Sequence, residues 1–314
     1  MMTAKLLKLI PPHEYYAEAF GGGASLLFAK EPAKVETYND MDGGLVNMFR
    51  VLRDEAQFEK FKRMAEATPY SREEYLSCRE LLDKSDDPVE WAYRYFVVAR
   101  MSFGGAFGGG WGNIITQNSS EMAGTCARWL STIEMLPQIH ARMMSVQVEC
   151  LDWRKIITKY NVPGYLLYCD PPYVAASRRS GGYKHELVDQ DHKDLVQALL
   201  EYPAMVMLSG YPNELYKPLE DAGWDVQSFE VSCMVAGRTR LTGLQGAGAT
   251  EGTQKRTEVV WRNPAAMEAI SKGGDRFGQL PLLMGKPAEV IDEEVVEETV
   301  AEFCDDDQPE LDLK

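Results

Sequence analysis

The residues best suited to chemistry form the run Asp170-Pro171-Pro172-Tyr173, which follows an apolar stretch over residues 165–169. Two consecutive prolines cannot continue a hydrogen-bonded ladder, so the chain must leave a sheet rigidly at this point. Asp170 and the Pro171 carbonyl can then accept the two N–H bonds of an exocyclic amino group, while Tyr173 stacks on the attached ring. A Pro-Pro turn after a buried strand would explain only the prolines. The pattern therefore indicates a site for an amino group on a flat ring.

A second run, Phe20-Gly21-Gly22-Gly23, lies between a predicted strand and a predicted helix. Glycines let a ligand approach the backbone closely, and the N-terminus of the following helix favours negative charge. The run is not a P-loop, because no Gly-Lys-Ser/Thr follows, and Leu26 occupies the third glycine position of a dinucleotide fingerprint. Such a turn suits a nucleoside-type ligand without phosphates, such as S-adenosylmethionine (AdoMet). A purely structural turn is the alternative.

Asp40 comes at the end of the next predicted strand. In nucleotide-binding folds an acidic residue at this place accepts hydrogen bonds from ribose hydroxyls. It can also cap the helix that follows, and both roles can hold at once. No metal site is expected, because the six cysteines lie far apart without a Cys-x-x-Cys pair and the four histidines show no metal-ligand spacing.

The composition is that of a folded chain with an acidic C-terminal segment. The 314 residues are 45% hydrophobic, enough for a full core, and carry a net charge of −15. Residues 286–314 hold 12 acids and 2 bases, which is −10 of that total and leaves −5 for the rest. This tail is expected to stay solvated and disordered, to bind a protein partner or to mimic DNA. No apolar run is long enough to span a bilayer and no signal peptide is apparent, which predicts a cytoplasmic protein without membrane contact.

The order of strands, turns and helices around these residues predicts an α/β fold with a doubly wound, mostly parallel sheet. Residues 1–54 and 146–264 show this order, and residues 55–145 are mostly helical, which indicates an insertion. Residues 265–314 are expected to form a linker and the acidic tail. Strands are predicted over residues 15–19, 35–38, 146–150, 165–169, 204–208, 226–232 and 258–261. The predicted helices include residues 24–29, 88–101, 125–136 and 189–201, with Pro137 ending the third of these.

Taken in order, these motifs resemble those of the Dam-like (D12 class) DNA adenine-N6 methyltransferases, most of all the phage-encoded members. The resemblance runs from about Pro11 to Pro264. It implies a Rossmann-like AdoMet-dependent methyltransferase fold in which the helical insertion recognises the target. It also implies double-stranded DNA as the partner, a flipped-out adenine as the acceptor and a role such as restriction–modification near the nucleoid. The matching motifs are Glu18-Ala19-Phe20-Gly21-Gly22-Gly23, Tyr38-Asn39-Asp40, Asp152-Trp153 and Asp170-Pro171-Pro172-Tyr173.

The resemblance also assigns roles to individual residues. The family usually opens with a Pro-Gly-Gly-Lys segment that contacts the cofactor, whereas this chain begins Met1-Met2-Thr3-Ala4, which predicts a truncated start or weaker AdoMet binding. Ala19 stands where the family generally has proline, which loosens the turn. The implied catalytic residues are Asp170, Pro171, Pro172 and Tyr173. AdoMet is expected as methyl donor, without a metal, at Phe20, Gly21, Gly22, Gly23, Asp40, Asp152, Trp153 and Asp170.

DNA contacts are expected from local groups of basic residues, because the whole chain is acidic. One group directly follows the Asp-Pro-Pro-Tyr run, and a second lies in a glycine-rich stretch over residues 234–257. Each of these side chains could instead be an ordinary solvated charge. The expected phosphate contacts are Arg100, Arg178, Arg179, Lys184, Arg238 and Arg240.

Two other kinds of function stay compatible with the sequence. Related Pro-Pro-Tyr motifs serve methyltransferases that act on cytosine N4, an RNA base or a protein amide. A chain with impaired AdoMet binding would instead be a non-catalytic DNA-binding relative. The DNA sequence that is recognised does not follow from composition, since base readout depends on where side chains lie in the groove.

Overall fold

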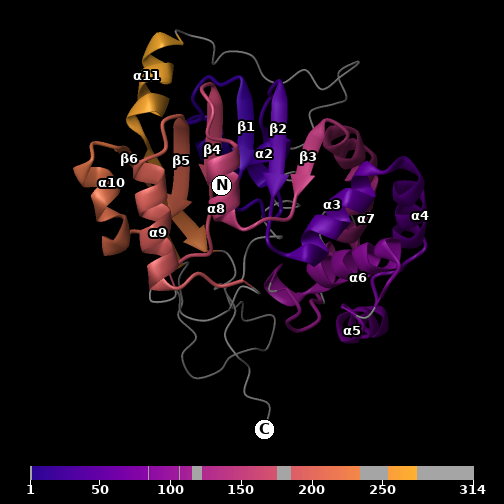
Figure 1. Ribbon diagram of the computed structural model, residues 1–314. Coiled ribbons are helices and arrows are strands. Elements are labelled where there is room, and N and C mark those ends of the chain that lie inside the picture. The colour runs from indigo at the N-terminus through magenta and orange to yellow at the C-terminus, as the bar shows by residue number, and fades with distance from the viewer. Residues whose placement is uncertain are drawn as a thin grey trace.

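The computed structural model describes residues 2–83, 85–105, 107–114, 122–174, 185–233 and 254–273. One sheet has the strand order β3-β2-β1-β4-β5-β7-β6 (Figure 1). β1 to β5 are parallel, and β7 is antiparallel to both β5 and β6. The expected doubly wound, mostly parallel sheet is confirmed, and its arrangement is Rossmann-like. The strands are β1 (Tyr15–Glu18), β2 (Val35–Asn39), β3 (Val146–Glu149), β4 (Tyr165–Cys169), β5 (Met205–Gly210), β6 (Asp225–Cys233) and β7 (Gln254–Arg262).

Helices cover both faces of the sheet, which explains why β4 and β5 are almost entirely apolar. Successive strand residues point to opposite faces, so Leu166 belongs to one core and Leu167 to the other. The first core includes residues of α1 (Met2–Leu7), α2 (Ser25–Ala29) and α11 (Pro264–Lys272). The second includes residues of α8 (Trp153–Lys159), α9 (Asp189–Leu200) and α10 (Lys217–Asp221), the last preceded by the 3-10 helix η3 (Glu214–Tyr216).

The helices that lie between β2 and β3 in the chain gather beyond the β3 edge of the sheet (Figure 1). Four of them begin at a side chain that accepts a hydrogen bond from a backbone N–H of the first turn: Asp42, Asp54, Ser71 and Asp87. Their apolar faces join the first sheet core, so the helical region and the sheet share one interior. The helices are α3 (Gly43–Arg53), α4 (Glu55–Glu66), α5 (Arg72–Glu80), α6 (Pro88–Met101) and α7 (Gly124–Met143).

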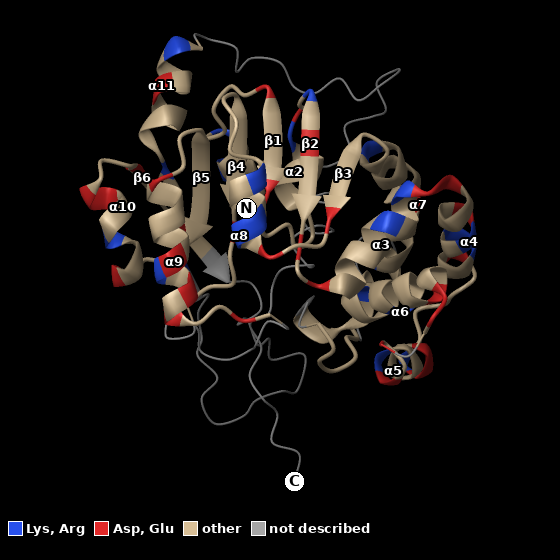
Figure 2. Cartoon of the chain, in the orientation of Figure 1, with Lys and Arg blue, Asp and Glu red and all other residues tan. Residues whose placement is uncertain are grey.

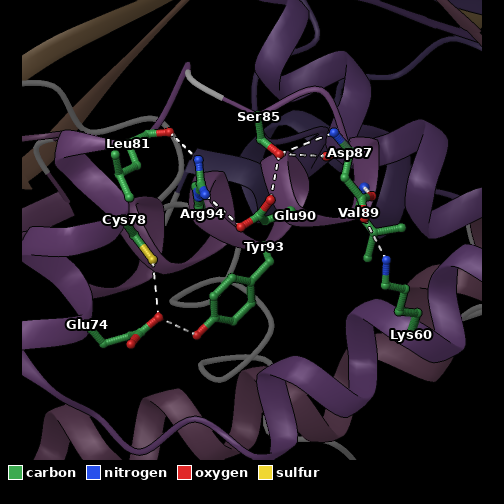
Figure 3. Close-up of polar contacts among 10 residues, drawn as sticks. All are labelled: Lys60, Glu74, Cys78, Leu81, Ser85, Asp87, Val89, Glu90, Tyr93 and Arg94. Atoms are coloured by element: carbon green, nitrogen blue, oxygen red, sulfur yellow. Dashed lines mark hydrogen bonds and ion pairs between the residues drawn. The ribbon is translucent and has the colours of Figure 1, made fainter.

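Polar contacts connect α4, α5 and α6 (Figure 3). The Tyr93 hydroxyl of α6 donates to Glu74 of α5 at 2.8 Å. Lys60 of α4 pairs with Asp87, the residue that caps α6, at 2.6 Å. Burial, reinforced by Glu74, raises the pKa of the Cys78 thiol to about 12, so this cysteine stays protonated and unreactive near neutral pH.

Two segments differ from the sequence-based expectation. Pro137 lies inside α7, which continues to Met143 instead of ending before the proline. Leu136 and Met143 are both buried, and this burial outweighs the one backbone hydrogen bond that proline cannot donate. The segment after Pro264 is the helix α11 rather than a linker, because the Asn263 side chain caps it by accepting from Ala266 N at 3.0 Å.

Charged residues lie mostly on the helices and loops, and the central strands carry few (Figure 2). Glu18 of β1 and Glu36 of β2 are exceptions, each only 1% exposed. Buried carboxylates are costly unless they are paired or used, so both require an explanation. In the described part of the chain, no helix is long and apolar enough to cross a membrane.

Candidate active site

The residues that the sequence predicts to bind the cofactor and the substrate lie together at the carboxyl ends of β1, β2 and β4. The register pairs Glu18 of β1 with Tyr38 of β2 on one side and with Tyr168 of β4 on the other. The next residues of all three strands therefore leave the sheet at the same edge. The strand order reverses at β1, which is where ligands bind in doubly wound sheets.

The glycine turn between β1 and α2 is pressed against β2. A Cβ on Gly21 would lie 2.2 Å from the Tyr38 ring, so no larger residue fits there. The Tyr38 hydroxyl donates to the Gly22 carbonyl at 2.8 Å, and Gly22 has a φ of +47°, which favours glycine. Gly21 is therefore required by its packing against Tyr38, and Gly22 is favoured by its backbone conformation.

Asp40 holds this turn from the end of β2. Its Oδ2 accepts from Gly22 N at 3.0 Å and its Oδ1 from Asp42 N at 2.8 Å. Burial raises the pKa of Asp40, and these two N–H groups partly offset the rise. The residue that caps α3 is Asp42, so the capping alternative for Asp40 does not hold. Each Asp40 oxygen keeps a second lone pair for a ribose hydroxyl.

Asn39 joins three segments of the site, a role that the sequence analysis missed. Its amide nitrogen donates to the Ala19 carbonyl at 2.9 Å and to the Leu151 carbonyl at 3.0 Å. Its amide oxygen accepts from Leu151 N at 2.8 Å. A buried Asn at a strand end was the available signal, because such a side chain must find backbone partners.

Asp152 and Trp153 begin α8 beside the glycine turn. Asp152 caps the helix by accepting from Arg154 N at 2.8 Å. Trp153 is buried, and its ring lies 6.2 Å from that of the half-buried Phe20. The buried Trp153 ring therefore packs beside Phe20, and Phe20 is the more exposed ring of the pair.

Asp170 follows β4 with one oxygen unused. Its Oδ1 is buried and has no hydrogen-bond partner among the described residues. Burial raises the pKa of Asp170 to about 6, against hydrogen bonds from the Tyr168 and Tyr173 hydroxyls that lower it. The Tyr173 ring lies 4.3 Å from that of Tyr211, which follows β5. A carboxylate oxygen that can accept a hydrogen bond therefore lies close to an aromatic ring, and the two together could bind an amino group on a flat ring.

Glu18 is a second buried carboxyl group at this edge, and the sequence analysis gave it no role beyond its motif. Its Oε1 accepts from the Tyr16 hydroxyl at 2.7 Å, and its Oε2 has no hydrogen-bond partner among the described residues. Burial raises the pKa of Glu18 to about 8, although Tyr16 and the Leu27 backbone lower it. Two buried oxygens without donors, on Glu18 and Asp170, fit a ligand that brings N–H groups or positive charge.

Of the residues expected to contact DNA, the structure describes Arg100, and it is buried. Arg100 is only 8% exposed, and its Nη2 donates to Thr132 Oγ1 at 2.9 Å, joining α6 to α7. The expectation that Arg100 contacts phosphate is therefore corrected, because its side chain lies in the interior between these helices. Within the described ranges, no group of His, Cys, Asp or Glu is placed to hold a metal ion. Arg178, Arg179, Lys184, Arg238 and Arg240 lie outside the described residues.

Comparison with known proteins identifies the family of this chain. A search of curated proteins finds no match. The family model described as D12 class N6 adenine-specific DNA methyltransferase matches residues 2–222, which is more than half of the chain and includes β1 to β5. The chain thus belongs to the D12 class of N6 adenine-specific DNA methyltransferases, enzymes that transfer a methyl group from AdoMet to N6 of adenine in DNA.

Proposed function

We propose that Asp170, the Pro171 carbonyl and Tyr173 form the catalytic group of this methyltransferase, with Pro172 fixing the turn. The observation that carries the proposal is the buried, unpartnered Oδ1 of Asp170 at the end of β4. The amino nitrogen of adenine is a poor nucleophile because its lone pair is delocalised into the ring. Acceptance of both N–H bonds by Asp170 and Pro171 would direct that lone pair away from the ring. Positioning and electrostatics then supply most of the acceleration.

The cofactor-binding residues are proposed to be Phe20, Gly21, Gly22, Gly23, Asp40, Asp152, Trp153 and Asp170, with Glu18 added from the structure. When bound, AdoMet supplies an electrophilic methyl group on a sulfonium. The glycine turn leaves its backbone accessible, Asp40 offers lone pairs to ribose hydroxyls, and Phe20 offers a ring face to a positive charge. Glu18 offers a buried carboxylate for a cationic part of the cofactor. Trp153 and Asp152 act by holding Phe20 and α8 in place.

The DNA-binding regions are proposed on sequence grounds. The helical residues 55–145 would recognise the target, between the two parts of the catalytic domain at 1–54 and 146–264. Arg178, Arg179, Lys184, Arg238 and Arg240 would contact phosphates of double-stranded DNA. The target adenine would be flipped out of the duplex, with stacking on Tyr173 offsetting part of the few kcal/mol that extrusion costs. The enzyme would act on cytoplasmic DNA, and residues 286–314 could bind a protein partner.

Methyl transfer is expected to fail at acidic pH because only ionised Asp170 can accept an N–H bond with either oxygen. Its pKa of about 6 in the ligand-free enzyme predicts that kcat/KM falls about tenfold per unit as pH drops below 6 and is level above about 7. The measurement is transfer of labelled methyl from AdoMet to unmethylated DNA between pH 5 and 8.5, followed by nucleoside mass analysis. N6-methyladenine with this acidic limb supports the proposal. N4-methylcytosine, or a rate independent of pH across 6, contradicts it.

AdoMet binding is expected to strengthen as pH rises from 7 to 8. Glu18 is mostly protonated at pH 7, since burial raises its pKa to about 8, and a cationic ligand favours the ionised form. Binding then releases a proton, so the dissociation constant should fall by up to about tenfold over this interval. Calorimetric titration of the DNA-free enzyme measures this. Glu18→Gln should remove the pH dependence, and a Glu18→Gln variant that keeps it would exclude Glu18 as its source.

A further inference from the structure

Helix α6 of the helical insertion packs against the start of α3, close to the residues that follow β2. A Cβ on Gly44 of α3 would lie 2.7 Å from the Tyr95 ring of α6, so the two helices approach too closely there for a larger residue. One turn further along α3, the Asn47 side chain donates to the Pro88 carbonyl at 2.8 Å. Pro88 and Tyr95 are seven residues apart and therefore lie on the same face of α6. This face is fixed against the first turns of α3.

The Tyr95 hydroxyl donates a hydrogen bond to Oδ2 of Asp42 at 3.0 Å. Oδ1 of Asp42 accepts from Gly44 N at 2.9 Å, which caps α3. The backbone N–H of Asp42 in turn donates to Oδ1 of Asp40 at 2.8 Å. Oδ2 of Asp40 accepts from Gly22 N at 3.0 Å. Hydrogen bonds through Asp42 and Asp40 therefore connect Tyr95 of the insertion with the glycine turn.

We propose that Tyr95 is a positioning residue for AdoMet binding, which fixes Asp42 so that the Asp42 N–H holds the Asp40 carboxylate ready for the ribose hydroxyls. This inference rests on the proposed role of Asp40 in binding ribose. A carboxylate that is held in place before the ligand arrives loses less freedom on binding, and the affinity is higher for that reason. The insertion, for which the sequence predicts target recognition, thereby also supports the cofactor site.

The Tyr95 side chain is held by packing as well as by its hydrogen bond. It is 6% exposed, and Gly44 leaves room for its ring on α3. The centre of the ring lies 4.5 Å from that of Phe107, in the glycine-rich stretch that follows α6. A buried ring with these neighbours keeps its hydroxyl in one place. A substitution that removes the hydroxyl and keeps the ring therefore separates the hydrogen bond from the packing.

The test is calorimetric titration of AdoMet into DNA-free Tyr95→Phe and wild-type protein, with labelled methyl transfer to DNA as a second measurement. The variant keeps the ring and loses one hydrogen bond to a carboxylate, so the Kd for AdoMet should rise about three- to tenfold. The KM for AdoMet should rise with it, while kcat at saturating AdoMet should stay within about twofold of wild type. This division is expected because the substitution leaves the Asp-Pro-Pro-Tyr turn unchanged.

The matched control is Tyr93→Phe. Tyr93 lies on the same helix and is also buried, but its hydroxyl donates to Glu74 of α5 at 2.8 Å (Figure 3). This variant should keep the Kd for AdoMet within about twofold of wild type. An unchanged Kd in Tyr95→Phe, or an equal rise in Tyr93→Phe, would overturn the inference. If Tyr95→Phe does not fold, Asp42→Ser takes its place, because serine also caps helices but has no second oxygen for Tyr95. An unchanged Kd in that variant overturns the inference equally.

A double-mutant cycle with Asp40→Ala measures whether Tyr95 acts through Asp40. Asp40→Ala alone should raise the Kd for AdoMet about ten- to a hundredfold, because the ribose hydroxyls lose hydrogen bonds to a charged group. In that background Tyr95→Phe should add less than about twofold, since no carboxylate remains to be positioned. The same rise with and without Asp40 would contradict the positioning role of Tyr95. Wild-type AdoMet affinity in Asp40→Ala would instead refute the proposed ribose contact of Asp40 itself.

Discussion

Asp170→Ala should lower kcat for methyl transfer to DNA by about a hundred- to a thousandfold. The substitution removes the buried Oδ1 that is proposed to accept one N–H bond of adenine and leaves the Pro171 carbonyl as the only acceptor. AdoMet affinity should change far less, because most of the proposed cofactor contacts lie on β1, β2 and the glycine turn. Product analysis by nucleoside mass measurement, together with AdoMet calorimetry, separates these two effects.

The same variant should be no less stable than the wild type. Burial raises the pKa of Asp170 to about 6, so the ionised carboxylate costs folding free energy at pH 7. That cost is full above about pH 6, declines as pH falls toward the ordinary pKa of 3.8, and is absent below it, where the group is protonated in both the folded and the unfolded state. Alanine removes it, so Tm at pH 7 should hold or rise. Asp170→Asn is the size-matched control, which keeps one acceptor oxygen and should retain intermediate activity. Near-normal transfer by Asp170→Ala would contradict the proposed mechanism.

Glu36→Gln should lower the free energy of unfolding more than Asp170→Ala or Glu14→Gln does. Glu36 is 1% exposed and lies 2.5 Å from Lys30 Nζ of the loop after α2 and 2.5 Å from Arg142 Nη1 of α7. Burial alone would raise the pKa of Glu36, but Arg142 and Lys30 hold it below its usual value. Lys30 is itself only 3% exposed in its side chain, so removing the carboxylate leaves two cations without their counter-charge.

The free energy of unfolding should fall by about 3–5 kcal/mol and Tm by on the order of 10 °C. Chemical denaturation and calorimetry measure these values. The control is Glu14→Gln, which breaks the pair with Lys34 at 3.1 Å where both side chains are more than half exposed. That variant should lose less than about 1 kcal/mol. Equal losses of unfolding free energy in the two variants would show that the buried ion pairs of Glu36 with Lys30 and Arg142 do not stabilise the contact between α7 and the sheet.

Several parts of the fold could be predicted because their signals are local. The apolar residues of β4 end at two prolines, so both the strand and its exit follow from the chain itself. Asp87 and Pro88 begin α6 in the structure as their order predicts. In contrast, Pro137 predicts a helix end, and only the burial of Leu136 and Met143 on either side shows why α7 continues.

For the site, the sequence by itself determined the order of the motifs and the chemical groups at each strand end. The family match shows the reaction class. Only the tertiary structure decided which oxygens are already bonded and which are not. Glu18 and Tyr168 lie 150 positions apart in the chain and become neighbours through the pairing of β1 with β4. The sequence analysis predicts that Arg100 contacts DNA from the surface. The packing of α6 against α7 instead buries its side chain, which donates a hydrogen bond to Thr132. Local residue types specify strands and turns, whereas burial and hydrogen-bond partners depend on distant segments that no local pattern encodes.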